Sequence, residues 1–329
     1  MINHNDTFFV AGHNGMVGSA VVRSLKKSGY QKILTERRDK LDLTSLEQVK
    51  SWFSNHKPNV VIIAAAKVGG IAANYSFPSE FLLENLKIQN NIIETAWLNG
   101  VKRLLFLGSS CIYPKYAPQP IKEESLLSGY LEPTNECYAI AKISGIKLCQ
   151  ALRKQYGFDA FSLMPTNLYG PGDNYDLENS HVLPALIRKF YDAYINNKKE
   201  VICWGTGQPL REFLHVDDLG DACVYSLERF DPDSVQSPKD KKDNSLGFLN
   251  VGTGKDLKII ELAELIAKII GFKGKIYWDK SKPDGTPKKQ LDITRIQNLG
   301  WQPKIKLSEG IKKTVEVFIK NYNDGKMRV

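Results

Sequence analysis

The apolar residues in the first half of the chain follow two alternating patterns. Short continuous apolar runs, typical of strands buried on both faces of a sheet, occur at residues 7–11, 60–65, 103–107 and 159–164. Segments whose apolar residues recur at the spacing of one helix face separate them, at residues 16–28, 45–55, 80–99 and 137–156. This alternation predicts an α/β fold, a doubly wound parallel sheet with ligands at the carboxyl ends of its strands.

The pattern becomes less regular after residue 165. Residues 165–181 are rich in Asn, Gly, Pro and Tyr, which is typical of a long functional loop. Residues 231–245 are charged and almost without apolar side chains, so we expect a solvated loop there. A strand at 248–251 and helices at 257–270 and 308–321 predict a smaller C-terminal α+β domain for the substrate.

These patterns predict two domains in a chain of 329 residues. The first is residues 1–168, to which residues 205–250 return in part, and the second is mainly residues 169–329. Residues 1–6 are polar, and we expect them to be frayed.

Composition narrows the class of protein. With 42% apolar and 25% charged residues, the chain has the balance of a soluble globular protein, and no apolar run approaches the roughly 20 residues of a membrane span. The net charge is +9, with basic residues concentrated at Arg37-Arg38, residues 239–242 and Lys288-Lys289. No aromatic-interleaved basic stripe accompanies them, so we interpret these groups as solvated surface and expect no nucleic-acid partner. A basic balance also suits anionic small molecules such as nucleotides.

The cysteines indicate a reducing environment. The chain has five of them, without C-x-x-C spacing or a paired His cluster, which argues against a zinc or other metal site. The number is odd and no signal peptide precedes them, so we expect reduced thiols in the cytoplasm.

A glycine-rich loop follows the first predicted strand and opens the first helix. Its sequence is Gly12-His13-Asn14-Gly15-Met16-Val17-Gly18. Glycines at this point allow a tight turn and a close approach of the backbone to a pyrophosphate, which the helix N-terminus attracts. The alternative is a purely structural strand–helix turn, but the context of strand and helix favours a dinucleotide site.

The residues that would bind the adenosine ribose give a mixed signal. Glu36 stands where an acidic residue would hold the ribose of NAD. Arg37 and Arg38 follow directly and could clamp the 2′-phosphate of NADP. We favour NADP(H).

A serine and a Tyr-x-x-x-Lys pair supply the groups for moving a proton while a hydride moves. Ser109 ends the strand at 103–107, and Tyr138 and Lys142 share one face of the helix that begins near residue 137. An ammonium group near a phenol would lower the pKa of the phenol, and the serine hydroxyl can bind the same substrate oxygen. Tyr-x-x-x-Lys also occurs at residues 194–198 and 322–326, but no strand-end serine precedes those copies.

Cys111 and His181 are additional candidates for acid–base chemistry. A free cysteine after a strand is usually a packing residue, but Cys111 lies in a polar strand-end turn. An isolated histidine is often a cap or a surface group, whereas His181 follows the irregular loop at 165–180. His215 lies among apolar residues before a helix, and we interpret it as structural.

Together these residues resemble the extended short-chain dehydrogenase/reductases, and within them the epimerase-reductases that act on GDP-4-keto-6-deoxy-D-mannose. The resemblance covers residues 8 to about 320, interrupted mainly by residues 231–245. Its specific stretches are Gly108-Ser109-Ser110-Cys111-Ile112-Tyr113-Pro114 and Asn179-Ser180-His181-Val182. Matches at residues 64–71, 132–142, 164–171, 211–218 and 282–287 are shared with related sugar-nucleotide enzymes.

The resemblance implies a Rossmann fold, an NADP-dependent oxidoreductase and isomerase, and a role for each matching residue. The implied catalytic residues are Ser109, Cys111, Tyr138, Lys142 and His181. The implied cofactor-binding residues are Gly12, His13, Asn14, Gly15, Met16, Val17, Gly18, Arg38, Leu107, Gly108, Ser109, Ser110, Lys142, Pro165, Thr166, Asn167, Leu168 and His181. The implied substrate-binding residues are Lys189, Trp204, Arg211 and Asp284.

The implied reaction is epimerisation of GDP-4-keto-6-deoxy-D-mannose at C3 and C5, followed by NADPH-dependent reduction at C4. The resemblance also implies a homodimer formed through the helices near 80–99 and 137–156. Asn14 and Glu36 depart from the family pattern, which often has basic residues there, and both weaken the preference for NADP.

Two other functions are compatible with parts of the sequence. An NAD-dependent nucleotide-sugar 4-epimerase or 4,6-dehydratase would use the same serine, tyrosine and lysine. The dehydratases would need an acidic residue where Cys111 stands. A non-catalytic dinucleotide sensor would need none of Ser109, Tyr138 and Lys142, so their presence argues against it.

Overall fold

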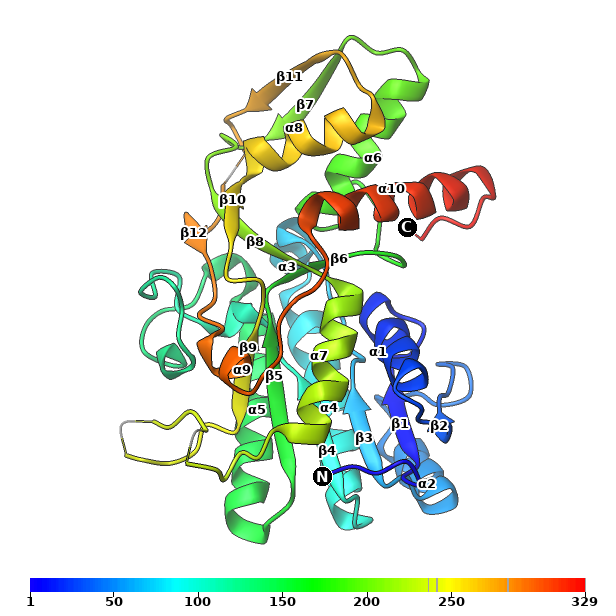
Figure 1. Cartoon of the computed structure of the whole chain (residues 1–329), viewed down its shortest axis with the longest axis vertical. Helices are drawn as coiled ribbons and strands as arrows, with labels where there is room; N and C mark the ends of the chain where they lie inside the picture. The colour runs from blue at the N-terminus through cyan, green and yellow to red at the C-terminus, as the bar shows by residue number, and fades with distance from the viewer. Residues whose placement is uncertain (236, 241, 283, 329) are drawn as a thin grey trace.

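A parallel sheet with helices on both faces forms one half of the protein (Figure 1). The computed structural model describes residues 1–235, 237–240, 242–282 and 284–328. All neighbouring strands of this sheet run parallel, in the order β2 (Ile33–Leu34), β1 (Phe8–Ala11), β3 (Val60–Ile63), β4 (Arg103–Leu107), β5 (Ala160–Pro165) and β9 (Phe248–Val251). This confirms the predicted doubly wound sheet.

Helices cover the sheet in two groups. On one face α1 (Met16–Lys27) packs along α7 (Val216–Arg229). On the other face α4 (Pro78–Leu98) packs between its neighbours α2 (Leu46–His56) and α5 (Glu136–Tyr156). The carboxyl ends of the strands are left open toward the second half of the molecule (Figure 1).

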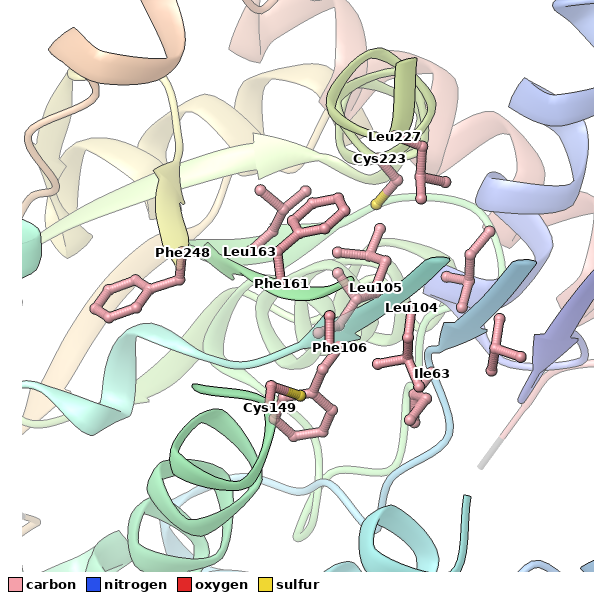
Figure 2. Close-up of a cluster of buried hydrophobic side chains, with 14 of the residues drawn as sticks. Ile63, Leu104, Leu105, Phe106, Cys149, Phe161, Leu163, Cys223, Leu227 and Phe248 are labelled. Atoms are coloured by element: carbon pink, nitrogen blue, oxygen red, sulfur yellow. The ribbon is translucent and has the colours of Figure 1, made fainter. Parts of the chain in front are cut away.

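β4 lies inside the sheet, and its side chains are buried on both faces. Figure 2 shows Leu104, Leu105 and Phe106 surrounded by the neighbouring strands, with Cys149 of α5 on one side and Cys223 of α7 on the other. Burial of each large apolar side chain contributes about 1.5–3 kcal/mol. The strand that presents Ser109 therefore has little freedom to move.

The second half is a smaller α+β unit with its own apolar core. Its strands are β6 (Asn167–Tyr169), β7 (Glu200–Trp204), β8 (Leu210–His215), β10 (Asp256–Lys258), β11 (Lys275–Asp279) and β12 (Lys288–Lys289). Its main helices are α6 (Val182–Ile195), α8 (Ile259–Ile270) and α10 (Leu307–Asn323). β8 pairs with β6, β10 and β12, so it holds these three strands of the second half together.

Five short elements complete the described part of the chain. They are α3 (Ile71–Ser76), α9 (Thr294–Asn298), and the 3-10 turns η1 (Ser110–Ile112), η2 (Glu123–Ser125) and η3 (Pro133–Asn135). Of these, η1 follows β4 and η3 precedes α5, so both border the open edge of the sheet.

Two expectations about local structure need correction. The helix predicted at 257–270 begins at Ile259, because the preceding residues pair with β8 as β10. The N-terminal segment is not frayed throughout: Asp6 is buried and accepts hydrogen bonds from Asn3 N at 2.8 Å and Lys102 Nζ at 2.9 Å.

The described residues of the charged segment at 231–245 form a loop, as expected, although part of it is buried. Asp233 forms an ion pair with Arg153 of α5 at 2.6 Å, and Ser237 and Pro238 are buried. Residues 236 and 241 of this segment lie outside the described residues.

Candidate active site

The glycine loop is tightly folded and leaves polar groups without protein partners. Gly12 has φ +87°, and a Cβ there would lie 2.6 Å from Ala65 N, while a Cβ on Gly18 would lie 2.1 Å from Gly12 O. No side chain caps the N-terminus of α1 at Gly15, and the buried His13 Nδ1 has no hydrogen-bond partner among the described residues. The loop therefore fits a pyrophosphate, which would accept hydrogen bonds from such donors.

Arg37 and Arg38, which follow β2, differ in their contacts. Arg37 N donates to Glu36 Oε1 at 3.1 Å, and Arg37 Nε pairs with Asp39 at 3.1 Å. Arg38 is exposed, and its guanidinium has no hydrogen bond or ion pair within the described part of the chain. Arg38 is thus the better placed of the two to bind a ligand phosphate.

The end of β4 places Ser109 beside Cys111. Ser109 precedes η1 and its side chain accepts a hydrogen bond from Cys111 N at 3.4 Å. Cys111 is 6% exposed, and burial raises the pKa of its thiol. Four effects oppose this rise in the pKa: the charge of Lys289, the hydrogen bond with Ser109, the charge of Lys142 and a hydrogen bond with the backbone of Cys111 itself.

Tyr138 and Lys142 lie in the first turns of α5, facing β4. Lys142 Nζ donates to Leu107 O at 2.8 Å and lies 5.8 Å from the centre of the Tyr138 ring. Burial lowers the pKa of Lys142 to about 8. Burial also raises the pKa of Tyr138, as does the nearby Cys111, while the hydrogen bond with Ser109 opposes the rise.

The predicted effect of Lys142 on Tyr138 is therefore not found. The pKa of the phenol is above its ordinary value, and Lys142 is not among the groups that shift it. Burial is the largest effect on the pKa of the phenol, and the ammonium group is held at the Leu107 carbonyl, over the Phe106 ring at 4.8 Å.

His181 is held in a different way, at the end of the loop between β6 and α6. It is the N-cap residue of α6 and is exposed to solvent. Gly70 N donates to Asn179 O at 2.8 Å, and a Cβ on Gly70 would lie 2.5 Å from Ser180 O. Desolvation by the surrounding protein lowers the pKa of His181, and the charge of Lys289 lowers it further.

Lys289 is a site residue that the sequence did not reveal. The Lys288-Lys289 pair was interpreted as solvated surface, but Lys289 is only partly exposed, and its charge acts on both Cys111 and His181. Burial lowers the pKa of Lys289 itself. The available signal was its position just after the 282–287 stretch, which is too weak to place a side chain.

A second cluster is formed by side chains from α6, from the end of β7 and from the segment after β11. Lys189 Nζ lies 5.1 Å from the centre of the Trp204 ring and donates to Ile202 O at 3.2 Å. Trp204 is 50% exposed, and Lys282 Nζ lies 5.4 Å from the same ring. An exposed indole between two ammonium groups suits a flat ring that carries an anionic group.

Arg211 and Asp284 meet near this cluster. Arg211 Nη2 donates to Asp284 O at 3.3 Å, and burial lowers the pKa of Arg211. The Asp284 carboxylate accepts from Thr206 N and Thr206 Oγ1, both at 2.7 Å, so it fixes the turn after β7. Pro283, which belongs to the matching stretch 282–287, lies outside the described residues.

The segment after β5 connects the two halves behind the site. Thr166 Oγ1 and Asn167 Nδ2 both donate to Glu212 O, at 3.2 Å and 2.9 Å. Pro165 ends β5 and Leu168 lies in β6, so these residues follow the carboxyl end of the sheet. This is the edge at which doubly wound sheets bind their ligands.

His215 has the structural role that the sequence predicted. His215 is buried and its Nδ1 accepts from Asp217 N at 3.2 Å at the start of α7. Cys149, Cys203 and Cys223 are buried.

The described residues contain neither a candidate metal site nor a candidate membrane span. No group of three or more His, Cys, Asp or Glu side chains in the described ranges could hold a metal ion. None of the helices described is long and apolar enough to cross a membrane.

The fold and site define the class of protein. Residues 8–238 match the NAD dependent epimerase/dehydratase family, and the chain belongs to that family.

Individual proteins extend the match to nearly the whole chain. GDP-L-fucose synthase 1 of Arabidopsis thaliana is 54% identical over 321 residues, which are 98% of this chain and 95% of that protein. A GDP-L-fucose synthetase from Naegleria fowleri, solved bound to NADP, has a TM-score of 0.86 at 28% identity and covers 99% of this chain and 98% of its own. A GDP-6-OMe-4-keto-L-xylo-heptose reductase from C. jejuni has a TM-score of 0.90 at 36% identity, over 97% and 99% of the two chains.

Proposed function

We propose that this protein converts GDP-4-keto-6-deoxy-D-mannose to GDP-L-fucose. It inverts C3 and C5 and then reduces the C4 ketone with NADPH, as an NADP-dependent oxidoreductase and isomerase. The similarity to the Arabidopsis GDP-L-fucose synthase over nearly the full length of both chains supports this function. The observation that carries it is the Cys111 thiol beside Ser109, Tyr138 and Lys142, together with His181, whose pKa is affected by the same Lys289 charge that acts on Cys111.

Inversion begins with the acidity of the two carbons that flank the ketone. Removing a proton from C3 or C5 moves the C–H electron pair into an enolate whose charge lies on the C4 oxygen. Returning a proton from the opposite face inverts the centre and restores the ketone. Cys111 and His181 come from different halves of the molecule, which suits a pair that acts from two faces.

Ser109 and Tyr138 act at the C4 oxygen. The Ser109 hydroxyl donates a hydrogen bond that stabilises the enolate. Burial keeps the pKa of Tyr138 above its ordinary value, so the phenol is protonated at neutral pH and can give its proton to the oxygen during reduction. When bound, NADPH supplies the hydride that C4 receives.

The cofactor is proposed to lie along the open edge of the sheet. Residues 12–18 would hold its pyrophosphate, and Arg38 would hold the 2′-phosphate. Lys142, fixed at the Leu107 carbonyl, would bind the nicotinamide ribose. Leu107, Gly108, Ser110, residues 165–168 and His181 would line the rest of the site.

The sugar nucleotide is proposed to lie against the second half. Arg211 would bind the diphosphate, and Lys189 and Trp204 would contact the GDP moiety. Asp284 contributes by holding the turn after β7, since both of its carboxylate oxygens already bind Thr206. The proposed division is thus residues 1–168 with part of 205–250 for NADP(H), and mainly 169–329 for the substrate.

The similarity to a C. jejuni heptose reductase favours a second candidate, a reductase of another GDP-4-keto sugar. The identity to the Arabidopsis protein is higher, and GDP-4-keto-6-deoxy-D-mannose is therefore the better choice of substrate. An NAD-dependent 4-epimerase or 4,6-dehydratase is less suitable, because Cys111 stands where the dehydratases resembled have an acidic residue.

An assay with defined substrate tests the proposal. The purified protein, GDP-4-keto-6-deoxy-D-mannose and NADPH should give one NADPH oxidised per sugar, with GDP-L-fucose identified by NMR. A product reduced at C4 without inversion at C3 and C5 would remove the epimerase activity from the proposal. No loss of NADPH absorbance would reject the reductase.

A homodimer is part of the proposal. α4 and α5 lie side by side and expose apolar side chains, including Leu83 at 54%, Leu98 at 57% and Ile140 at 42%. Pairing these two helices with those of a second copy would cover them. Light scattering should give twice the monomer mass, and Leu83→Glu should reduce it. The free cysteines suit a reducing compartment such as the cytoplasm.

A further inference from the structure

Glu212 is a buried carboxylate on β8 that the proposed reaction does not use. Its Oε1 accepts hydrogen bonds from Thr253 N at 2.5 Å and Gly254 N at 2.8 Å, and its Oε2 accepts one from Leu291 N at 2.8 Å. These donors belong to the segments that follow β9 and β12, which are far apart in the sequence. A buried carboxylate is costly unless it is hydrogen-bonded, so this residue holds both segments to β8.

The two faces of β8 serve different halves of the molecule. Successive side chains of a strand point to opposite faces. Glu212 and Leu214 share one face, and Leu214 belongs to the apolar core around the parallel sheet. On the other face Phe213 belongs to the core of the second half, and Arg211 Nη2 donates to Asp284 O at 3.3 Å. The carboxylate therefore anchors β8 to the first half from the face opposite Arg211.

The backbone after β9 leaves space for a carboxylate and supplies only donors to it. A Cβ on Gly252 would lie 2.2 Å from Glu212 Oε1, so the glycine lets the chain close around this oxygen. Both oxygens of a carboxylate accept hydrogen bonds, whereas an amide has one acceptor and one NH2 group. Glutamine would turn that NH2 group either toward Leu291 N or toward Thr253 N and Gly254 N. The contacts thus favour the carboxylate over its amide isostere.

The backbone carbonyl of Glu212 makes a separate set of contacts. It accepts from Thr166 Oγ1 at 3.2 Å and from Asn167 Nδ2 at 2.9 Å, and both of these residues are proposed to line the NADPH site. A change of the side chain leaves this acceptor in place. The effect of the carboxylate on the substrate side can therefore be measured apart from the cofactor side.

We propose that Glu212 is a positioning residue for the substrate: its carboxylate fixes β8 against the segments after β9 and β12, and so holds Arg211 where the diphosphate of a GDP-sugar binds. β12 contributes to this arrangement, because its Lys289 lies opposite Arg211 and Leu291 follows two residues later. The role of Arg211 rests on the proposed function, but the anchoring of β8 does not.

Binding measurements on the intact protein test this role. Glu212→Gln keeps the size of the side chain and replaces one acceptor by a donor. The Kd for GDP, measured by calorimetry, should rise about 10-fold, because Arg211 loses its fixed position. The Kd for NADPH, measured by cofactor fluorescence, should change less than about two-fold, because the carbonyl contacts remain. An unchanged Kd for GDP in the folded variant would overturn the proposal.

Asp218→Asn is the matched control for a loss of stability alone. Asp218 is also buried, on α7, and its carboxylate accepts from Lys304 N at 3.2 Å and Ile305 N at 3.0 Å, in the segment before α10. This variant should lower the melting temperature without changing the Kd for GDP. Equal losses of GDP affinity in Asp218→Asn and Glu212→Gln would overturn the proposal. Gly252→Ala, which places a methyl group against the carboxylate, should weaken GDP binding and replaces Glu212→Gln if that protein does not fold.

Amide hydrogen exchange of the ligand-free protein tests the anchoring without substrate. Residues 210–214 and 288–291 should exchange about 10-fold faster in Glu212→Gln than in the wild type, and unchanged exchange would overturn the proposal. With GDP-4-keto-6-deoxy-D-mannose, the variant should raise KM more than it lowers kcat, and the reverse result would contradict a role in substrate positioning. If the wild-type protein binds no GDP, the proposed function fails, while hydrogen exchange still decides whether Glu212 holds β8.

Discussion

The two regions that meet at the site are held in different ways. Ser109 follows β4, and Tyr138 and Lys142 belong to α5; the packing of this strand and helix around Phe106 leaves little space. His181 ends a loop, is exposed, and is held through its neighbours Asn179 and Ser180 against Gly70. One region is part of the core of the sheet, and the other is attached to it by a few backbone contacts.

This difference matches two different demands of the chemistry. Protonating an oxygen beside a hydride donor requires a fixed geometry, which strands and helices supply. Choosing which carbon is deprotonated depends on the substrate, and loops can vary without disturbing the core. The comparison predicts that changes in the first region affect reduction, and changes in the second affect epimerisation.

Replacing Tyr138 with phenylalanine should have the largest effect and should separate the reductase activity from the epimerase activity. Loss of the phenol removes the proton donor at C4, so NADPH oxidation should fall about 1,000-fold. Deuterium exchange at C3 and C5 should stay within a few-fold of wild type, because Cys111 and His181 are unchanged. Equal loss of both activities would show that the two regions do not act separately.

The loop that carries His181 should also make the stability of the protein depend on pH, because it contains Asp173. This residue lies between β6 and α6, its Oδ1 accepts from Asn174 N at 2.8 Å, and its buried Oδ2 has no partner among the described residues. Burial raises the pKa of Asp173 from 3.8 to about 7, with Asn174 and the charge of Arg328 opposing. A raised carboxyl pKa means that the folded state binds this proton more tightly, so stability falls as pH rises from about 4 to 7.

Asp173→Asn removes this dependence because the amide stays neutral. Its gain in unfolding free energy should be about 2–3 kcal/mol greater at pH 8 than at pH 5. Urea denaturation of both proteins at the two pH values measures the difference. An equal change in the unfolding free energy at pH 5 and pH 8 would mean that the Asp173 carboxylate is not buried without a partner. The loop would then not differ from α5 in this respect.

The contact between Gly70 and the loop offers a direct way to disturb His181. Gly70 has an ordinary φ of −66°, so an alanine there meets no backbone strain, but its Cβ would lie 2.5 Å from Ser180 O. Gly70→Ala should displace the loop and lower deuterium exchange about 10- to 100-fold, with little change in NADPH affinity. Cofactor fluorescence titration supplies the second measurement. Retained exchange in a folded variant would show that the loop does not depend on this contact.

The same comparison explains what could be predicted from sequence. The run at 103–107 and the helix that follows residue 136 carry strong local patterns, so the placement of Ser109 and Tyr138 at the sheet edge followed from periodicity alone. The raised pKa of Tyr138 did not, because it depends on how deeply the phenol is buried in the folded chain.

Lys289 could not be predicted for a related reason. β12 is only two residues long and carries no period, and its inward face is set by pairing with Arg211, far away in the sequence. The same holds for Asp284, whose two bonds to Thr206 are a tertiary contact. Local patterns locate the rigid region, whereas the residues that complete the site depend on how distant segments meet.

Arg38 should show the smallest effect, on the choice of cofactor. Its exposed guanidinium can bind the 2′-phosphate of NADPH, but solvent weakens such a contact, so Arg38→Ala should raise the KM for NADPH about 5-fold and leave that for NADH unchanged. Arg37 is already paired with Asp39, so Arg37→Ala should change the NADPH value less. Steady-state kinetics with both cofactors compare the two variants. A larger effect at Arg37 would assign the 2′-phosphate to that residue, and equal effects on NADPH and NADH would show that neither arginine distinguishes the cofactors.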